Sequence, residues 1–333
     1  MIYPKSLKDN DTIAIIAPSN GIIKERKIKA LDVAKENLSN NGFIIDESKD
    51  VRKSVYGVSN TAKDRAEDFM KYIKNKDIDC IITATGGDFL IEILEYINSN
   101  DILKNIKWVQ GHSDTTNLLH ILTTALDIAT IYSCNVTGFG YESLHESQLN
   151  NIKILKGELI SQKSYDYFES LSEKGTERYN LSTKTSWKII GKKKSKLNGR
   201  IIGGCLDCLL DIVGTKFDYT NKFIDKYSNN KIIWYFDVSD LTNEDILRGI
   251  WQLRNAGWFK NTIAVMFGRL KYEVSYTGIK LSEAISRALN NDEICVITDI
   301  DLGHTNPKFT IINGAIAHIN INDGKGEISF ELQ

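Results

Sequence analysis

The sequence predicts an α/β fold in which a parallel sheet is covered by helices on both faces. Short apolar runs at residues 12–17, 80–85 and 108–110 are continuous rather than alternating, as is typical of strands that are buried on both faces. A turn and then a segment with helical spacing of apolar residues follow these runs, which indicates βαβ units. In such sheets, ligand sites lie beyond the carboxyl ends of the strands.

The first half of the chain contains these elements in a regular order. The first strand ends at Pro18, and the helix after it ends near Gly42, where Asn and Gly are common terminators. The predicted order is a strand at 12–17, a helix around 28–38, a strand at 43–45, a helix at 61–73, a strand at 80–85, a helix at 89–97 and a strand at 108–110.

The last of these strands leads into the most informative stretch of the chain. The strand ends at Gly111, Ser113 follows two residues later, and an apolar helix pattern begins at once. This layout is that of a nucleophile elbow, in which the glycine leaves room for a tight turn and the helix N-terminus favours negative charge at the serine. The alternative is that Ser113 is only the N-cap of the helix, because serine is a common cap.

The second half of the chain has a looser beginning and then another α/β pattern. We expect domains at residues 1–160 and 198–333, joined by a linker and aromatic loop at 161–197. The expected elements of the second domain are a strand at 232–236 before Asp237, a helix capped by Thr242 and Asp245, a strand at 262–267, a helix at 279–289, a strand at 295–299 before Gly303, and a β-rich end at 309–330 with a turn at 322–324.

Composition excludes several classes of function. The chain of 333 residues has a formal net charge of -1, so its charge does not favour nucleic acid or an anionic membrane as a partner. Its five cysteines include Cys205 and Cys208 in a C-x-x-C, but no second pair stands at zinc-ligand spacing, so we expect no metal. No signal-like segment or apolar run near ~20 residues is evident, and we expect a cytoplasmic protein.

A serine nucleophile needs a base and a carboxylate that orients it. His304 follows a predicted strand and Gly303, and Asp237 ends an apolar strand where a charge is costly unless it is paired. Gly86 and Gly87 end a neighbouring strand and offer a backbone N–H to an oxyanion, together with that of Asp114. A loop-stabilising role for His304, a helix-capping or turn role for Asp237, and a simple turn at the glycine pair remain open alternatives. No dinucleotide or P-loop motif is present, and we expect no cofactor.

At this point the chain resembles the LD-carboxypeptidase family of serine peptidases, and within it the MccF-like branch of microcin C self-immunity proteins. The motifs run in family order over nearly the whole chain. They are residues 13–19 (IAIIAPS), 84–88 (ATGGD), 111–116 (GHSDTT), 199–204 (GRIIGG), 214–216 (GTK), 233–237 (IWYFD), 268–269 (GR), 303–304 (GH) and 311–315 (IINGA).

The resemblance implies a Rossmann-like N-terminal domain with the nucleophile elbow and a smaller C-terminal domain that supplies the acid and base. It assigns Ser113 as the nucleophile, His304 as the base, and the N–H groups of Gly87 and Asp114 as the oxyanion hole. Asp237 stands where the family has glutamate. This carboxylate is one methylene shorter, so we expect its bond to His304 to need a backbone shift or a water. Asp240 is a less favoured substitute.

The resemblance also implies hydrolysis of a small-molecule substrate in a cleft between the domains. The substrate is either a muropeptide that ends in a D-amino acid or a peptidyl or aminoacyl nucleotide. We expect Gly86, Trp187 and Arg269 to contact it, and we expect a homodimer. Because Asp237 replaces the glutamate of the family, the alternative hypothesis is that the chain is a catalytically weakened or non-catalytic ligand-binding protein of the same fold.

Overall fold

A computed structural model describes residues 1–170, 175 and 177–333, and it divides into two compact units. The first unit comprises the described residues of Met1–Glu158, Thr176–Arg178 and Thr310–Asn313. The second comprises those of Leu159–Gly175, Tyr179–Phe309 and Gly314–Gln333. Part of the expected aromatic loop, residues 171–174 and 176, lies outside the described residues.

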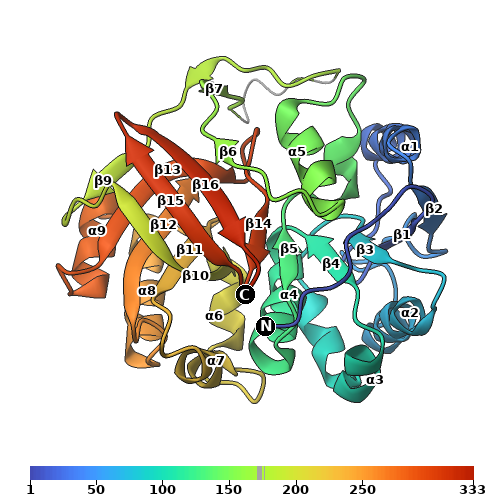
Figure 1. Ribbon diagram of the computed structural model, residues 1–333, viewed down its shortest axis with the longest axis horizontal. Coiled ribbons are helices and arrows are strands. Elements are labelled where there is room, and N and C mark those ends of the chain that lie inside the picture. The colour runs from blue at the N-terminus through green and yellow to red at the C-terminus, as the bar shows by residue number, and fades with distance from the viewer. Residues whose placement is uncertain (171–174, 176) are drawn as a thin grey trace. The chain divides into compact units, whose positions relative to one another are not determined.

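The first unit is built on a six-stranded sheet in the order β14-β5-β4-β3-β1-β2. β1 to β5 are parallel, and their hydrogen-bonded partners confirm the predicted parallel α/β arrangement. In Figure 1, α1 and α5 lie on one face of this sheet, and α2, α3 and α4 lie on the other. The strands are β1 (Thr12–Ile16), β2 (Ile44–Glu47), β3 (Cys80–Thr83), β4 (Trp108–Gly111), β5 (Thr130–Tyr132) and β14 (Ile311–Asn313). The α-helices are α1 (Glu25–Asn40), α2 (Ala62–Lys74), α3 (Ser99–Lys104), α4 (Thr116–Leu126) and α5 (Glu146–Leu155).

Two features of this unit differ from the expected pattern. The helix expected at 89–97 is a 3₁₀ helix, η1 (Leu90–Tyr96), which is followed by the short α3. The strand β14 comes from the far end of the sequence and pairs antiparallel with β5. Two further 3₁₀ helices are η2 (Ser113–Thr115) and η3 (Val136–Phe139).

The second unit contains an eight-stranded mixed sheet in the order β6-β16-β15-β10-β11-β12-β13-β9. Its centre, β10 to β13, is parallel, and the outer strands are antiparallel. The strands are β6 (Gln162–Lys163), β9 (Lys188–Ile190), β10 (Lys196–Cys205), β11 (Ile232–Asp237), β12 (Thr262–Arg269), β13 (Cys295–Gly303), β15 (Ile316–Asn322) and β16 (Lys325–Glu331). The helices are α6 (Leu206–Ile212), α7 (Thr220–Lys226), α8 (Asn243–Asn255) and α9 (Leu281–Leu289), and β7 (Tyr167–Phe168) pairs with β8 (Thr183–Lys184).

Most of the segment expected to be a linker and loop therefore belongs to the second unit, whereas Glu177 and Arg178 belong to the first. β6 and β9 form the two edges of its sheet, and β7 and β8 make a small hairpin of their own. These strands are only two or three residues long, which is too short for a periodic apolar pattern to be visible in the sequence. With this segment added, the second unit is similar in length to the first rather than smaller.

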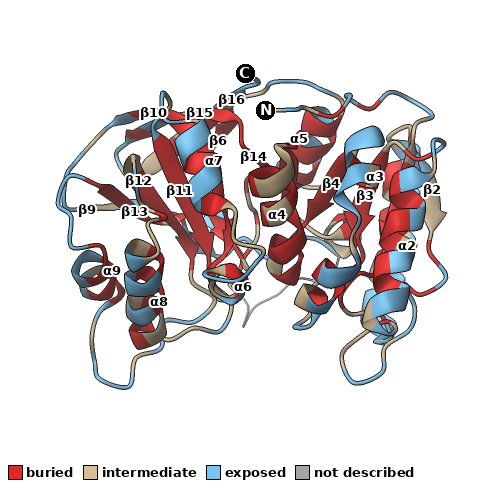
Figure 2. Cartoon of the chain, turned by 90° about the horizontal axis from the view of Figure 1, so that it is seen from below, coloured by how far each residue is buried: buried red, intermediate tan, exposed pale blue. Residues whose placement is uncertain are grey.

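The apolar strands form the core of each unit. In Figure 2 the sheet strands are buried over most of their length, whereas the helices α2, α8 and α9 alternate between buried and exposed faces. Ile13 to Ile16 of β1 and Ile232 to Asp237 of β11 are buried without interruption, which explains why their sequences do not alternate.

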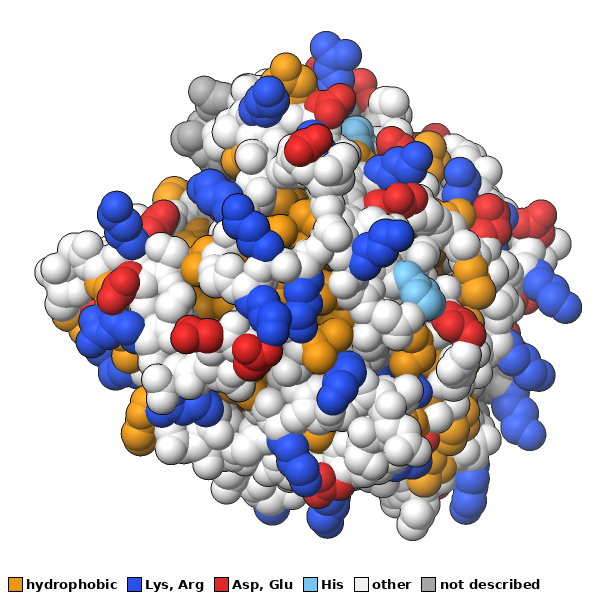
Figure 3. Space-filling model, turned by 60° about the vertical axis from the view of Figure 1, so that its left-hand side comes forward, with side chains coloured by type: hydrophobic (Ala, Val, Ile, Leu, Met, Phe, Trp, Pro, Cys, Tyr) orange, Lys and Arg blue, Asp and Glu red, His pale blue; other side chains and the backbone are white. Residues whose placement is uncertain are grey.

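The surface is mixed in charge, and the helices of the described segments do not suit a bilayer. Lys and Arg side chains are interspersed with Asp and Glu on the face shown in Figure 3, as the net charge of -1 predicts. Among the described residues, no helix combines the length and apolar character needed to cross a membrane.

Candidate active site

Ser113 lies on a sharp turn between β4 and α4. His112 is still extended, whereas Ser113 adopts the left-handed conformation with φ of 61° and begins the 3₁₀ turn η2. This conformation is unfavourable for a residue with a side chain and is typical of a nucleophile elbow. The N-cap position of α4 is held by Thr115, not by Ser113. The structure therefore favours the elbow over the helix-cap interpretation.

The turn requires glycine at its start. A Cβ atom on Gly111 would lie 2.4 Å from Thr115 Cγ2 and 2.5 Å from Thr83 Oγ1, so no side chain fits there. The following backbone is held by side chains of neighbouring elements. The N–H of His112 donates to Asn135 Oδ1 at 3.0 Å, and the N–H of Ser113 donates to the Tyr132 hydroxyl at 3.2 Å. The serine is thus presented by a fixed backbone.

The glycine pair after β3 lies directly against this turn. A Cβ atom on Gly86 would be 3.3 Å from Ser113 Oγ and 3.6 Å from the Asp114 nitrogen. A Cβ atom on Gly87 would be 2.2 Å from Ser19 Oγ. The backbone at Gly87 therefore approaches the loop after β1 more closely than a side chain would allow, and the backbone at Gly86 leaves little room for one beside Ser113. This placement suits the predicted oxyanion hole of Gly87 and Asp114, which stays a prediction.

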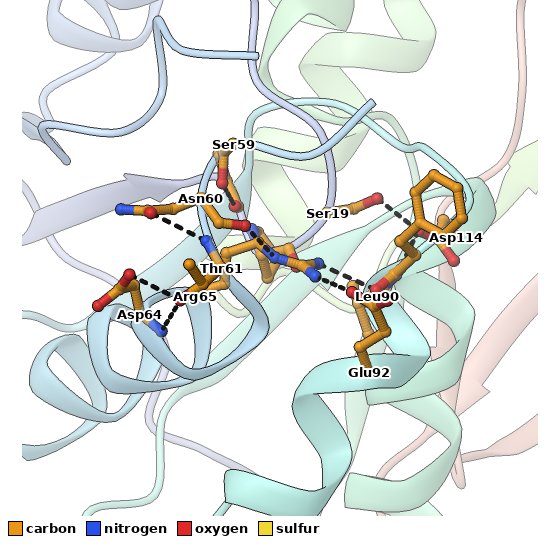
Figure 4. Close-up of polar contacts among 12 residues, drawn as sticks. Ser19, Ser59, Asn60, Thr61, Asp64, Arg65, Leu90, Glu92 and Asp114 are labelled. Atoms are coloured by element: carbon orange, nitrogen blue, oxygen red, sulfur yellow. Dashed lines mark hydrogen bonds and ion pairs between the residues drawn. The ribbon is translucent and has the colours of Figure 1, made fainter. Parts of the chain in front are cut away.

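The side chain of Asp114 joins the loops that follow three strands. Its Oδ2 accepts hydrogen bonds from Ser19 Oγ at 2.5 Å and from the Leu90 N–H at 2.9 Å (Figure 4). Its Oδ1 accepts one from Asn117 Nδ2 at 3.2 Å. Burial raises the pKa of the Asp114 carboxyl above its ordinary value, although the bonds from Ser19 and Leu90 act in the opposite direction. The sequence predicted only a backbone N–H role for Asp114 and did not predict these side-chain hydrogen bonds.

Arg65 supports the same loops from the other side. Its Nη1 donates to the carbonyl oxygens of Pro18 at 2.8 Å and Phe89 at 3.0 Å, and its Nη2 pairs with Glu92 at 2.5 Å (Figure 4). Burial lowers the pKa of Arg65, whereas the Glu92 carboxylate acts to raise it. The sequence signal that could have indicated this residue is an arginine on the apolar face of α2, beside Ala66 and Phe69.

The expected acid and base are in contact with each other in the second unit. Asp237 ends β11 with no exposed side-chain surface, and its Oδ1 lies 2.9 Å from His304 Nδ1. An ionised carboxylate can only accept a hydrogen bond, so this contact assigns the proton to Nδ1, and Nε2 is then the ring nitrogen that can accept a proton. The shorter aspartate therefore reaches the imidazole directly, and the water that we considered as a bridge is not needed.

Asp240, the less favoured carboxylate, is an exposed residue with other partners. It accepts a hydrogen bond from Ser239 Oγ at 2.7 Å and lies 3.5 Å from Lys271 Nζ. The Ser239 bond and the Lys271 charge hold the pKa of Asp240 below its ordinary value. The contact to His304 Nδ1 is made by Asp237.

The expected triad residues are divided between the units. Ser113 belongs to the first unit, with Gly86, Gly87 and Asp114, whereas Asp237 and His304 belong to the second. The first unit thus carries a serine at a strained turn, and the second carries an imidazole that is oriented by a carboxylate. These are the two parts of the predicted chemistry.

The placement of Trp187 and Arg269 does not support the substrate contacts expected of them. Both side chains are only 3% exposed. Trp187 Nε1 donates to Asp301 Oδ2 at 2.8 Å, and its ring packs against Phe309. Arg269 is bonded to Asp301 and to the loop after His304. Because their polar atoms already have partners within the protein, we assign both residues structural roles. Gly86 stays a predicted contact.

Comparisons with known proteins match both halves of the chain to one family. Residues 13–133 match the LD-carboxypeptidase N-terminal domain, and residues 198–319 match the LD-carboxypeptidase C-terminal domain. The two matched segments cover most of the chain and contain Ser113, Asp237 and His304.

Individual relatives and solved structures agree with this match. The chain is 26% identical to the microcin C7 self-immunity protein MccF of Escherichia coli, over 94% of this chain and 91% of the relative. An MccF-like protein from Bacillus anthracis has a TM-score of 0.85 at 21% identity, and MccF in complex with aspartyl sulfamoyl adenosine has a TM-score of 0.81 at 22% identity. Both structural matches cover 100% of each chain, and they confirm the fold.

Proposed function

Because the chain belongs to the LD-carboxypeptidase family, we propose that it is a metal-independent serine hydrolase of LD-carboxypeptidase type. The observation that carries this proposal is the 2.9 Å contact between Asp237 Oδ1 and His304 Nδ1. It supports a competent acid–base pair at the one position where the sequence departs from the glutamate of the family.

The proposed reaction is acyl transfer through a covalent intermediate. Ser113 Oγ attacks the scissile carbonyl carbon while His304 Nε2 accepts its proton, and Asp237 stabilises the imidazolium that forms. The N–H groups of Gly87 and Asp114 stabilise the oxyanion. His304 then protonates the leaving amine, and a water activated by the same imidazole hydrolyses the ester on Ser113. No metal or cofactor takes part in these steps.

Two substrate classes fit this reaction. One is the amide that joins a terminal D-amino acid to the preceding residue of a muropeptide, which the family resemblance implies. The other is the acyl bond of a peptidyl or aminoacyl nucleotide, which is supported by the similarity to MccF and by the aspartyl sulfamoyl adenosine bound to that protein. In both classes Ser113 attacks an acyl carbonyl carbon and His304 protonates the leaving nitrogen, so the same chemistry serves both.

A substrate panel tests the proposal. We expect turnover of a tetrapeptide muropeptide or of an aminoacyl-sulfamoyl adenosine, unaffected by a chelator and abolished by Ser113→Ala. The matched control is Ser39→Ala at an exposed serine of α1, which should retain wild-type turnover. Full turnover by Ser113→Ala would show that the mechanism is wrong.

The alternative is a ligand-binding protein without catalysis. It predicts binding of the same compounds without turnover and no labelling of Ser113 by an active-site serine probe. The direct Asp237–His304 contact favours the enzyme, because an orienting carboxylate serves an imidazole that transfers protons.

We further propose, from the family resemblance, a cytoplasmic homodimer. Light scattering of the purified full chain and fractionation of the source cells would test the assembly and the location. A monomer at working concentration would contradict the first part of this proposal.

A further inference from the structure

The loop that carries His304 is attached to one buried guanidinium group. Arg269 ends β12 and pairs with Gly303 of β13. The strands β12 and β13 lie side by side, and β13 leads into the loop (Figure 1). Its Nη1 pairs with Asp301 Oδ1 at 2.8 Å, its Nε donates to Thr305 Oγ1 at 3.0 Å, and its Nη2 donates to the Pro307 carbonyl oxygen at 2.5 Å. These three acceptors lie before and after His304, so one side chain holds the loop on both sides of the imidazole.

The partners of Arg269 are themselves fixed. Asp301 has no exposed side-chain surface, and its second oxygen accepts the hydrogen bond from Trp187 Nε1. The Phe168 ring covers the guanidinium, with 4.7 Å between the guanidinium carbon and the ring centroid. The planar fork of arginine matches this set of acceptors, which a lysine ammonium cannot reach together. The arrangement is therefore specific to arginine.

The backbone before His304 is equally constrained. Gly303 pairs with Arg269 in the sheet and has a φ of 106°. A Cβ atom on it would lie 2.8 Å from the Arg269 carbonyl oxygen and 3.3 Å from Asp237 Oδ1. The Arg269 backbone thus limits the chain directly before His304, in addition to the contacts that the Arg269 side chain makes before and after it.

We propose that Arg269, together with Asp301, is a positioning residue that holds the His304 imidazole in register with Asp237. This inference rests on the proposed function of His304 as the base. Arg269 acts through the loop and has no contact with the reacting atoms, so its replacement changes the orientation of the base and leaves substrate binding unchanged.

The test is Arg269→Lys in the full chain, with Arg200→Lys as the matched control. Arg200 is also a buried arginine of this sheet; it donates to the Gly314 carbonyl oxygen and stacks on Tyr227, 3.8 Å from the ring centroid. It pairs with Ile232 at the start of β11, whereas Asp237 ends that strand. The control therefore makes the same chemical change at the opposite end of the sheet from the imidazole.

We expect Arg269→Lys to lower kcat by roughly 10- to 100-fold, because small misplacement of a catalytic group has effects of this size. KM should stay within about twofold, since binding in the ground state is unchanged. Arg200→Lys should retain the wild-type kcat, even if its melting temperature falls by as much as that of Arg269→Lys. Equal kcat values for the two variants would overturn the proposal.

A second readout is independent of turnover. The proton on His304 Nδ1 is followed by NMR, with its signal assigned by its absence in His304→Gln. We expect this signal to shift or broaden in Arg269→Lys and to be unchanged in Arg200→Lys. An unchanged signal in both variants would contradict the positioning role, even if the wild-type chain had no activity on any substrate tested and the proposed function had failed.

If Arg269→Lys does not fold, Thr305→Val provides the same test at one of the three contacts. This change removes the acceptor of Arg269 Nε and keeps the shape of the side chain. We expect the same direction of effect on kcat and on the Nδ1 signal, with a smaller size. No effect on either readout would count against the proposal.

Discussion

At the scale of single residues, Asp237 decides whether the candidate site is competent. Burying an ionised carboxylate is costly unless it is paired and hydrogen-bonded, and Asp237 has no exposed surface at the end of an apolar strand. Its contact with His304 supplies such a partner at 2.9 Å. The shorter side chain is therefore paired in its buried position without the additional methylene of a glutamate.

The buried pairing of Asp237 predicts that Asp237→Glu lowers both the free energy of unfolding and kcat. The extra methylene must enter a space bounded by His304 and by Gly303, where even a Cβ atom would be 3.3 Å from Asp237 Oδ1. We expect the free energy of unfolding to fall by about 1–3 kcal/mol, as is usual for overpacking, and kcat to fall as well. Urea unfolding and turnover measure the two effects. Asp240→Glu is the exposed control, and a rise in kcat for Asp237→Glu would show instead that the aspartate weakens the enzyme.

The residues that could be predicted from sequence are those next to strand ends. Ser113, Asp237 and His304 each follow an apolar run, so local pattern alone marked them as candidates. The supporting roles of the Asp114 and Arg269 side chains could not be found in this way, although both residues were singled out for other roles. Asp114 and Arg269 act through hydrogen bonds to residues far away in the chain, such as Ser19 and Thr305, and no local pattern encodes those partners.

At the scale of elements, the elbow is a strained connection between a strand and a helix. Ser113 has a positive φ, which costs a residue with a Cβ atom roughly 1–2 kcal/mol relative to glycine. The strain is maintained by the bonds that hold the backbone of His112 and Ser113 to Asn135 and Tyr132. The geometry is thus a property of β4, η2 and α4 acting together.

A pair of variants measures that strain. Ser113→Ala and Ser113→Gly both remove the hydroxyl, but only glycine relaxes the backbone. We expect Ser113→Gly to exceed Ser113→Ala in free energy of unfolding by about 1 kcal/mol, with neither variant turning over substrate. Denaturant unfolding of the two proteins gives the comparison. If Ser113→Ala were as stable as Ser113→Gly, the turn would not be strained in solution.

The elements that could be predicted are the long, strongly periodic ones. The capped helix α8 begins at Asn243 with the predicted capping box of Thr242 and Asp245, and the hairpin of β15 and β16 turns where expected. The secondary structure of the segment at 161–197 could not be predicted from sequence, because its strands are short and pair with partners such as β13 and β16 that are distant in sequence. Register with a remote strand is not visible in a local pattern.

At the scale of the whole molecule, the chain returns to its first unit near its end. The expected boundary between domains is crossed again by β14, which completes the first sheet, while the residues before and after it belong to the second unit. Thr310 is buried in the first unit, where its hydroxyl contacts Ser133 Oγ at 3.0 Å and accepts a hydrogen bond from Asn151 Nδ2 at 3.1 Å. The chain therefore cannot release β14 without losing buried hydrogen bonds.

This threading predicts that the two units unfold together. Calorimetry of the full chain should show one transition, and Thr310→Val should move all of it to lower temperature, because unsatisfied buried partners cost about 1–3 kcal/mol. The matched control is Thr262→Val in β12, where the buried hydroxyl has no hydrogen-bond partner among the described residues, so its loss should not move the transition to lower temperature. Two separate transitions, of which Thr310→Val moves only one, would show that β14 does not couple the stability of the units.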